Sequence, residues 1–138
     1  MIYGDRDYRC PWLAAENVAL VANYSDHQHF VNSGYEKIVT NATYSGGVTK
    51  QYDKFSFSRV FEAGHSVSAY QPETVYRIFM RSMFDRDVAT GNHDIVGAKY
   101  SSTGPKSSWG IKNVLPTVPS TCMIEGQFQN VSVWEDFW

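Results

Sequence analysis

The 138-residue chain is about one ordinary domain in length, and its 43% hydrophobic and 15% aromatic content indicates a buried core and excludes a disordered chain. A net charge of −2 with scattered basic residues excludes the clustered basic face that nucleic-acid binding needs. No apolar run approaches the roughly 20 residues of a transmembrane helix, and no signal peptide follows Met1.

The chain begins with a pattern of strand, loop and helix. Residues 1–3 are typical of a buried strand. Residues 4–12 are typical of a loop, with Asp5 and Asp7 as turn-forming residues. Good helix formers then predict a helix from Trp12 to Ala22.

A β-hairpin and a second helix come next. Alternating polar and apolar residues predict the hairpin over residues 46–64, with its turn at Gly46-Gly47 and with Phe57 and Val60 on opposite faces. Pro72 is suited to the first turn of the second helix, which we expect to end between residues 85 and 91. Its apolar stripe is expected to pack in the core: Val75, Tyr76, Ile78, Phe79, Met80, Met83 and Phe84.

The composition changes after Gly91, where Gly, Ser, Thr and Pro become frequent. Such a composition predicts an extended, poorly packed arm with little regular structure. We therefore divide the chain into a folded part over residues 1–91 and an arm over residues 92–138.

His65 is the residue best suited to catalysis, because imidazole exchanges protons near neutral pH and loops at strand ends commonly carry such groups. The alternative is a surface histidine in a turn. An α/β-hydrolase also ends with these elements in this order: strand, Asp-rich loop, helix, hairpin, turn with His, and helix. Its triad runs Ser, Asp or Glu, then His, and the acid orients the histidine that acts as general base.

Two motifs resemble the serine carboxypeptidase family. "IYGDRDYRCPW" is similar to its loop Tyr-Ala/Gly-Gly-Asp-X-Asp-X-X-Cys-Asn-Trp, and "VFEAGHSVSAYQPE" to its Gly-Ala-Gly-His-X-Val-Pro-X-X-Gln-Pro. The stretches "VALVANYSDHQHF" and "SSWGIKNVLPTVPSTC" resemble the secreted or cell-wall members of filamentous fungi. The resemblance extends to about Met123. It implies an α/β fold, the C-terminal part of an α/β-hydrolase: the last strands of the central sheet with two packing helices, followed by an extended arm.

The resemblance also implies roles for single residues. Asp7 and His65 match the triad aspartate and histidine. Cys10 matches a family cysteine beside the substrate, although a small buried thiol is an equal alternative. Ser66 follows the histidine and is expected to contact substrate, in a position where the family has Met or Glu. Gly64 is expected to permit the tight backbone of the turn.

The nucleophile motif Gly-X-Ser-X-Gly does not occur in the chain. By resemblance, the chain corresponds to roughly the last quarter to third of a family member and begins inside a central strand. We therefore expect it to release no C-terminal residues from peptides alone and to need the missing N-terminal part of the hydrolase domain. The alternatives are a non-catalytic secreted binding module and a truncated gene product. Mass spectrometry of the native protein separates these readings.

The resemblance further implies secretion or delivery to a vacuole, with no cofactor. Three Asn-X-Ser/Thr sequons make Asn23, Asn41 and Asn130 possible N-glycosylation sites in such a compartment. Cys10 and Cys122 are far apart, and no metal-ligand spacing surrounds them. By resemblance, Cys122 is expected to pair with an upstream cysteine.

Overall fold

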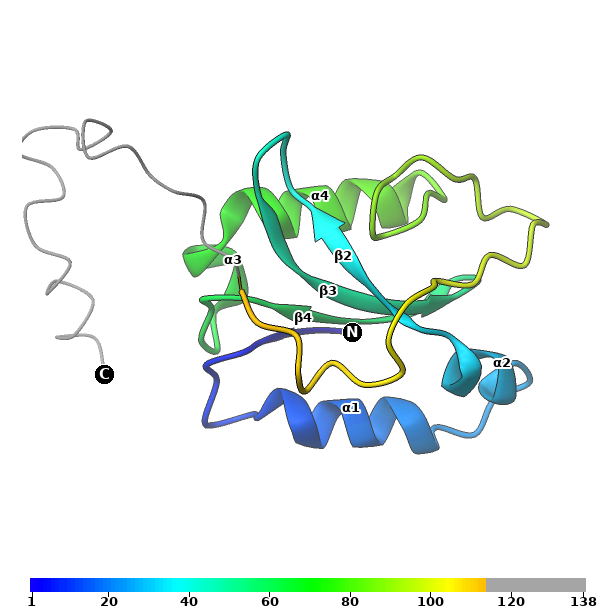
Figure 1. Cartoon of the computed structure of the whole chain (residues 1–138), viewed down its shortest axis with the longest axis horizontal. Helices are drawn as coiled ribbons and strands as arrows, with labels where there is room; N and C mark the ends of the chain where they lie inside the picture. Colours follow the sequence, from blue (N-terminus) through cyan, green and yellow to red (C-terminus); the bar gives the residue numbers. More distant parts are fainter. Residues whose placement is uncertain (114–138) are drawn as a thin grey trace, which may run out of the picture.

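The computed structural model describes residues 1–113, which form a small α/β domain with a mixed four-stranded sheet. Helices cover both faces of the sheet, with α1 and α2 on one side and α4 on the other (Figure 1). No helix among residues 1–113 is long and apolar enough to cross a membrane. The elements in chain order are β1 (Ile2–Gly4), α1 (Trp12–Val21), α2 (His27–Asn32), β2 (Tyr35–Val39), β3 (Ser45–Tyr52), β4 (Phe55–Val60), α3 (Val67–Tyr70) and α4 (Pro72–Met83).

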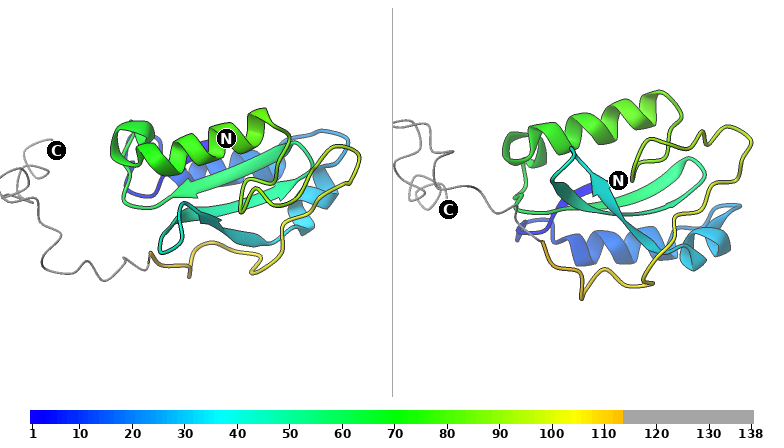
Figure 2. Two further views of the ribbon diagram at one scale, coloured as in Figure 1. Left: turned by 90° about the horizontal axis from the view of Figure 1, so that it is seen from above. Right: turned by 45° about the horizontal axis from the view of Figure 1, so that its top comes forward.

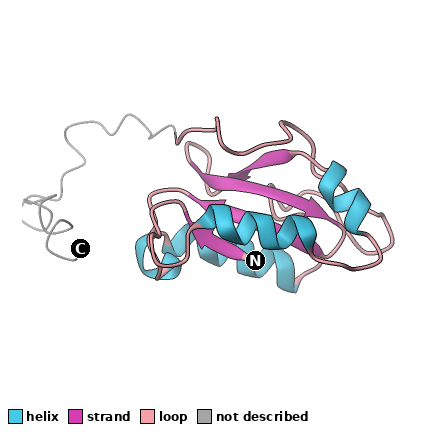
Figure 3. Ribbon diagram, turned by 90° about the horizontal axis from the view of Figure 1, so that it is seen from below, coloured by secondary structure: helices cyan, strands magenta, loops and turns pink. Residues whose placement is uncertain are grey.

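The strand order is β1-β4-β3-β2, so β1 lies at the end of the sheet beside a strand from the middle of the sequence (Figure 3). β1 and β4 are parallel, with Ile2 opposite Ser58 and Gly4 opposite Val60. The other two pairs are antiparallel. Because parallel neighbours end at the same edge of a sheet, the segments that follow β1 and β4 leave the sheet side by side.

The predicted alternation along β4 is confirmed, because its two faces contribute to two different cores. Phe57 packs on the α1 face, and Val60 packs on the α4 face. The first core contains Trp12, Ala15, Ala19, Phe30, Tyr35, Val48, Tyr52, Phe57 and Phe61. The second contains Ile38, Val60, Ala63, Ile78 and Val88. The sheet therefore separates two apolar layers, as expected when helices pack on both faces.

The predicted hairpin exists, but the prediction of its turn at Gly46-Gly47 is wrong. Both glycines lie inside β3, and the turn is formed at Asp53 and Lys54. Glycine is required at these strand positions by close neighbours. A Cβ atom on Gly46 would clash with the side chain of Thr74 in α4. Glycine can therefore mark close packing of a strand as well as a turn.

The expectation that the apolar stripe of α4 packs in the core is wrong for most of the stripe. Only Thr74 and Ile78 are buried in this helix. Four aromatic or aliphatic side chains are more than half exposed: Tyr76, Phe79, Met83 and Phe84. The described sheet has only four strands, and α4 buries only Thr74 and Ile78 against the rest of residues 1–113. Val75 and Met80 are half-buried, and the other four apolar side chains face solvent.

Residues 92–113 have little regular structure, as expected, and form a long connection without helix or strand (Figure 2). Three of these residues are nevertheless buried against the domain. The Ser102 hydroxyl accepts a 2.7 Å bond from the Gln51 amide and donates a 2.7 Å bond to the Gly34 carbonyl. Further along, Arg59 donates to the Ser108 carbonyl at 2.7 Å and stacks over Trp12 at 4.1 Å. This segment therefore covers part of the α1 face; residues 114–138 of the expected arm lie outside the described residues.

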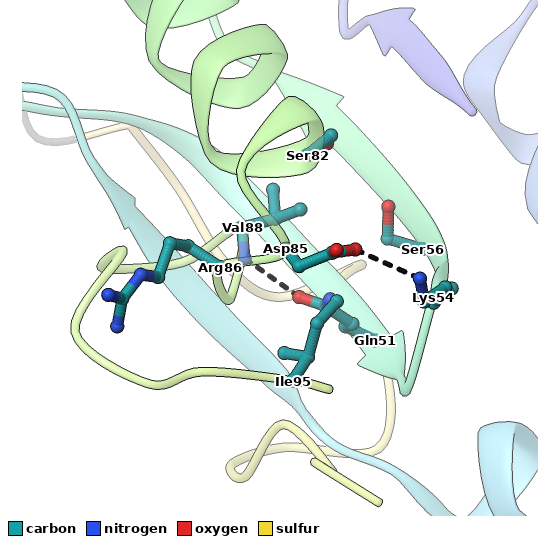
Figure 4. A pocket seen from close by; sticks show the side chains of 8 residues that line it. All are labelled: Gln51, Lys54, Ser56, Ser82, Asp85, Arg86, Val88 and Ile95. Atoms are coloured by element: carbon teal, nitrogen blue, oxygen red, sulfur yellow. Dashed lines mark hydrogen bonds and ion pairs between the residues drawn. The ribbon is translucent and has the colours of Figure 1, made fainter. Parts of the chain in front are cut away.

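The loop after α4 is held by the far end of the β3–β4 hairpin (Figure 4). The Val88 amide donates to Gln51 Oε1 at 2.8 Å, and Lys54 pairs with Asp85 at 3.0 Å. A pocket of about 60 Å³ lies between these residues. It is lined by neither Asp7 nor His65, and its volume admits only a few water molecules.

Replacing Gly46 by Ala tests the packing of α4 on the sheet. The new methyl group would push Thr74 away and break its 2.8 Å hydrogen bond to Thr40. We expect Gly46→Ala to lower the free energy of unfolding by about 1–3 kcal/mol in urea titrations. Gly110→Ala is the matched control, because no atom lies within 4 Å of its Cβ position, and its effect should stay below about 0.5 kcal/mol. Equal effects of the two substitutions would contradict the packing described.

Candidate active site

The two segments that leave the parallel strands β1 and β4 carry Asp7 and His65. Backbone hydrogen bonds tie the segments together, from the Asp5 amide to the Val60 carbonyl at 2.8 Å and from the Arg6 amide to the Ala63 carbonyl at 3.0 Å. Asp5 adds a side-chain bond, in which Oδ1 accepts from the Ala63 amide at 3.4 Å. The two loops are therefore joined before either candidate side chain is reached.

Two further features bring these loops close, and the sequence motifs did not predict either one. Gly4 has no Cβ, and one built there would clash with the carbonyl oxygen of Ala63. Arg6 forms an ion pair with Glu62 across the two loops. A glycine at the end of a strand, followed by charged residues of opposite sign in the two motifs, is the signal from which this clamp could have been inferred.

The left-handed residue of the His65 turn is Glu62, with φ of 53°. Gly64 is not among the described residues with positive φ, so a left-handed backbone at Gly64 is not what makes this turn tight. Left-handed backbone at a residue other than glycine costs free energy and persists only where its surroundings impose it. Here the ion pair with Arg6 supplies one such restraint.

Asp7 and His65 meet across the joined loops. Asp7 Oδ2 accepts a 2.9 Å hydrogen bond from His65 Nδ1. Asp7 Oδ1 accepts two more, from the backbone amides of Arg9 at 2.9 Å and Cys10 at 3.0 Å. The side chain of Asp7 is 4% exposed and that of His65 56% exposed. The carboxylate is therefore fixed from within the protein, whereas the imidazole faces outward.

Hydrogen bonding keeps Asp7 ionised in spite of its burial. Burial alone raises the pKa of the carboxyl, but the bonds from the Cys10 amide, the His65 ring and the Arg9 amide outweigh burial and lower the pKa. An ionised carboxylate can only accept hydrogen bonds, so His65 Nδ1 must carry the proton that joins them. Nε2 of the neutral ring is then left with its lone pair, and it has no hydrogen bond to residues 1–113.

Cys10 and Ser66, the expected substrate-binding residues, are both exposed beside the pair. The alternative that Cys10 is a buried thiol is therefore wrong. Its Sγ, an Asp7 oxygen and a ring nitrogen of His65 all lie within 4.8 Å of one another. Ser66 precedes α3, and its carbonyl accepts from the Ala69 amide at 2.8 Å. Protein side chains of the described part thus leave both residues accessible from solvent.

The described residues include two of the three possible glycosylation sites. Asn23 and Asn41 are exposed. Asn41 Oδ1 accepts from the Tyr44 amide at 3.0 Å, which fixes the amide side chain in the turn between β2 and β3. Asn130 and Cys122 lie outside the described residues.

Asp7→Asn tests the electrostatics of the pair. Because the folded-state pKa of Asp7 lies below its unfolded value of about 3.9, the ionised carboxylate contributes its full stabilisation above that pH. The contribution is lost as the pH falls through the folded-state pKa.

We expect Asp7→Asn to reduce the free energy of unfolding by about 1–3 kcal/mol at pH 7, and the difference from the parent to shrink by pH 3. Urea titrations of both proteins at the two pH values measure this difference. Both proteins contain the other acid-sensitive carboxyls, so the contributions of these groups to the free energy of unfolding cancel in the difference. One such group is Asp87, whose pKa is also lowered because hydrogen bonds outweigh its burial. An equal difference in the free energy of unfolding at both pH values would contradict the conclusion that hydrogen bonds to the ionised Asp7 stabilise the fold.

Comparisons with known proteins give one consistent result. Carboxypeptidase S1 homolog A of Arthroderma benhamiae is 47% identical over 126 residues, which are 90% of this chain and 19% of that protein. The carboxypeptidase Y homolog of the same fungus is 44% identical over 130 residues, 91% of this chain and 20% of that protein. Carboxypeptidase S1 of Penicillium janthinellum is 30% identical over 87 residues, 63% of this chain and 20% of that protein. No solved structure matches the chain significantly.

The chain thus spans about a fifth of the length of the relatives that it matches. A family model described as serine carboxypeptidase matches residues 1–85, a range that contains Asp7, Cys10, His65 and Ser66. The resemblance drawn from the two motifs is therefore confirmed over most of the described domain, and the chain belongs to the serine carboxypeptidase family.

Proposed function

We propose that this chain contributes the acid and the base of a serine-carboxypeptidase triad, and that the intact enzyme releases C-terminal residues from peptides. The observation that carries the proposal is the 2.9 Å bond from His65 Nδ1 to the buried Asp7 carboxylate. It leaves Nε2 outward and free to accept a proton, which is the state that a general base needs. Family membership supports the reaction type.

In the proposed mechanism, His65 Nε2 takes the hydroxyl proton of a serine as its oxygen attacks the peptide carbonyl. The imidazolium is stabilised by Asp7 and then gives the proton to the leaving amine. Since Gly-X-Ser-X-Gly is absent from the 138 residues, the nucleophile comes from another part of a longer protein or from a second chain. Removing a triad member costs most of the rate, so the chain alone is expected to be inactive.

Cys10 and Ser66 are proposed to contact the substrate near the scissile bond. Both are exposed next to the imidazole, and the amide of Cys10 is held by Asp7 Oδ1 at 3.0 Å. The backbone of Cys10 is therefore held by the same carboxylate that orients the base. Secretion or delivery to a vacuole, with glycans on the exposed Asn23 and Asn41, fits this role and is proposed with it.

The proposed partner is the rest of an α/β-hydrolase domain, of which this chain forms the C-terminal part. Within residues 1–113 the outer edge of β1 has no strand beside it (Figure 3). Met1 and Ile2 are exposed along it, and the apolar surface of α4 is open on one face of the same sheet. Unpaired strand edges and exposed apolar patches of this kind favour association with another chain.

His65→Ala in the longer protein tests the catalytic proposal. We expect the rate of peptide hydrolysis to fall by about 10⁴-fold or more, because the serine loses its base. His93→Ala is the matched control. His93 is also an exposed histidine, but it stacks on Tyr100 and lies outside the candidate site. The His93→Ala variant should therefore hydrolyse peptides at a rate close to that of the parent. Undiminished activity of His65→Ala would refute the assignment.

The open surface predicts that the isolated chain associates with itself. Sedimentation velocity at micromolar concentrations should show species larger than a monomer, and Phe79→Ser should reduce them by removing a ring that is 57% exposed. Val96→Ser, which changes a side chain 61% exposed outside α4, is the matched control and should leave the distribution unchanged. A monomer with one sharp thermal transition would argue against an unsatisfied surface.

A further inference from the structure

We propose that Asp7, Cys10 and His65 form a binding site for a thiophilic divalent cation such as Zn²⁺, and that this cation inhibits the base. The site is defined by geometry, because one donor atom from each of the three residues lies within 4.8 Å of the other two. No other such trio of His, Cys, Asp or Glu is found among residues 1–113. That cation binding is inhibitory rests on the proposed function; the binding itself does not.

The three donors form a suitable ligand set. Thiolate, imidazole nitrogen and carboxylate oxygen bind zinc at about 2.0–2.3 Å, so ligand atoms around a tetrahedral ion are about 3.3–3.8 Å apart. The observed spacing of at most 4.8 Å has to close by only about 1 Å. Cys10 and His65 are exposed, so rotation of their side chains can supply this movement without disturbing the core.

Asp7 can serve the cation without losing its place in the loop. Oδ1 is occupied by the amides of Arg9 and Cys10 and would remain so. Oδ2 accepts a single hydrogen bond, from His65 Nδ1, and a carboxylate oxygen has about two lone pairs. Oδ2 is therefore the oxygen that would reach the metal. Three protein ligands leave the fourth position of the ion for water.

Cation binding and general-base catalysis would exclude each other. The Cys10 thiol must release its proton to solvent before the sulfur can bind, and the ring of His65 must donate a lone pair to the metal. If Nε2 binds the metal, the proton acceptor is lost. If Nδ1 binds, its proton is displaced, and the hydrogen bond that orients the ring is broken. In either case the imidazole no longer serves the serine.

Co²⁺ binding to the full 138-residue chain tests the site without any reference to peptidase activity. The parent for this experiment carries Cys122→Ser, so that Cys10 is the single thiol. We expect a sulfur-to-cobalt charge-transfer band that Zn²⁺ abolishes by competition. Cys10→Ser should remove the band, and His65→Gln or Asp7→Asn should weaken Co²⁺ binding about tenfold or more. His93→Gln, an exposed histidine outside the trio, should bind as the parent does.

A band that persists in Cys10→Ser, affinity unchanged in His65→Gln, or no band in the parent would overturn the site. A second measurement tests inhibition in the longer protein, where each variant is compared with its own metal-free rate. Zn²⁺ should inhibit the parent at concentrations about tenfold or more below those needed for Cys10→Ser. Binding by the chain with no inhibition of an active enzyme would overturn the inhibitory role. A longer protein that shows no peptidase activity even without Zn²⁺ would contradict the proposed function, and the Co²⁺ measurement would still decide whether the cation site exists.

Discussion

The parallel pairing of β1 with β4 is the constraint on which both the sheet and the candidate site depend. It joins the first strand of the chain to one that begins at Phe55. The segments that follow the two strands start side by side, and Asp7 and His65 meet although they are 58 residues apart in sequence. A hydrogen bond between such distant residues is maintained only because the intervening hairpin and helices hold the strands in register.

The relative position of Asp7 and His65 is set mainly by backbone contacts. Gly4 allows the loop after β1 to touch the loop after β4, and amide-to-carbonyl bonds then connect them. Asp7 is buried and accepts two amide bonds besides that of His65. Its orientation is therefore determined by main-chain groups, which have little freedom to move, and the exposed imidazole takes its direction from this fixed carboxylate.

The two faces of the sheet differ in how well they are covered. On the α1 face, residues up to 113 add a layer in which Ser102 and Ser108 are buried and bonded. On the other face, α4 buries little more than Thr74 and Ile78. A chain that spans about a fifth of the length of its relatives and leaves most of the apolar stripe of α4 exposed is compatible with a part of a larger sheet.

The sequence by itself determined the types of β1, α1, the β3–β4 hairpin and α4, the alternation along β4 and the two motifs that indicate the family, because these depend on local preferences and on short patterns. It did not predict the strand β2 or the short helix α3. The tertiary structure alone decided the rest. The sequence pattern suggests that Gly46 is a turn residue, whereas the structure places it in a strand against Thr74. The pattern also suggests that the apolar stripe of α4 is buried, whereas most of it is exposed. Whether a glycine marks a turn or a contact, and whether an apolar residue is buried, depends on residues distant in the chain, and no local pattern contains that information.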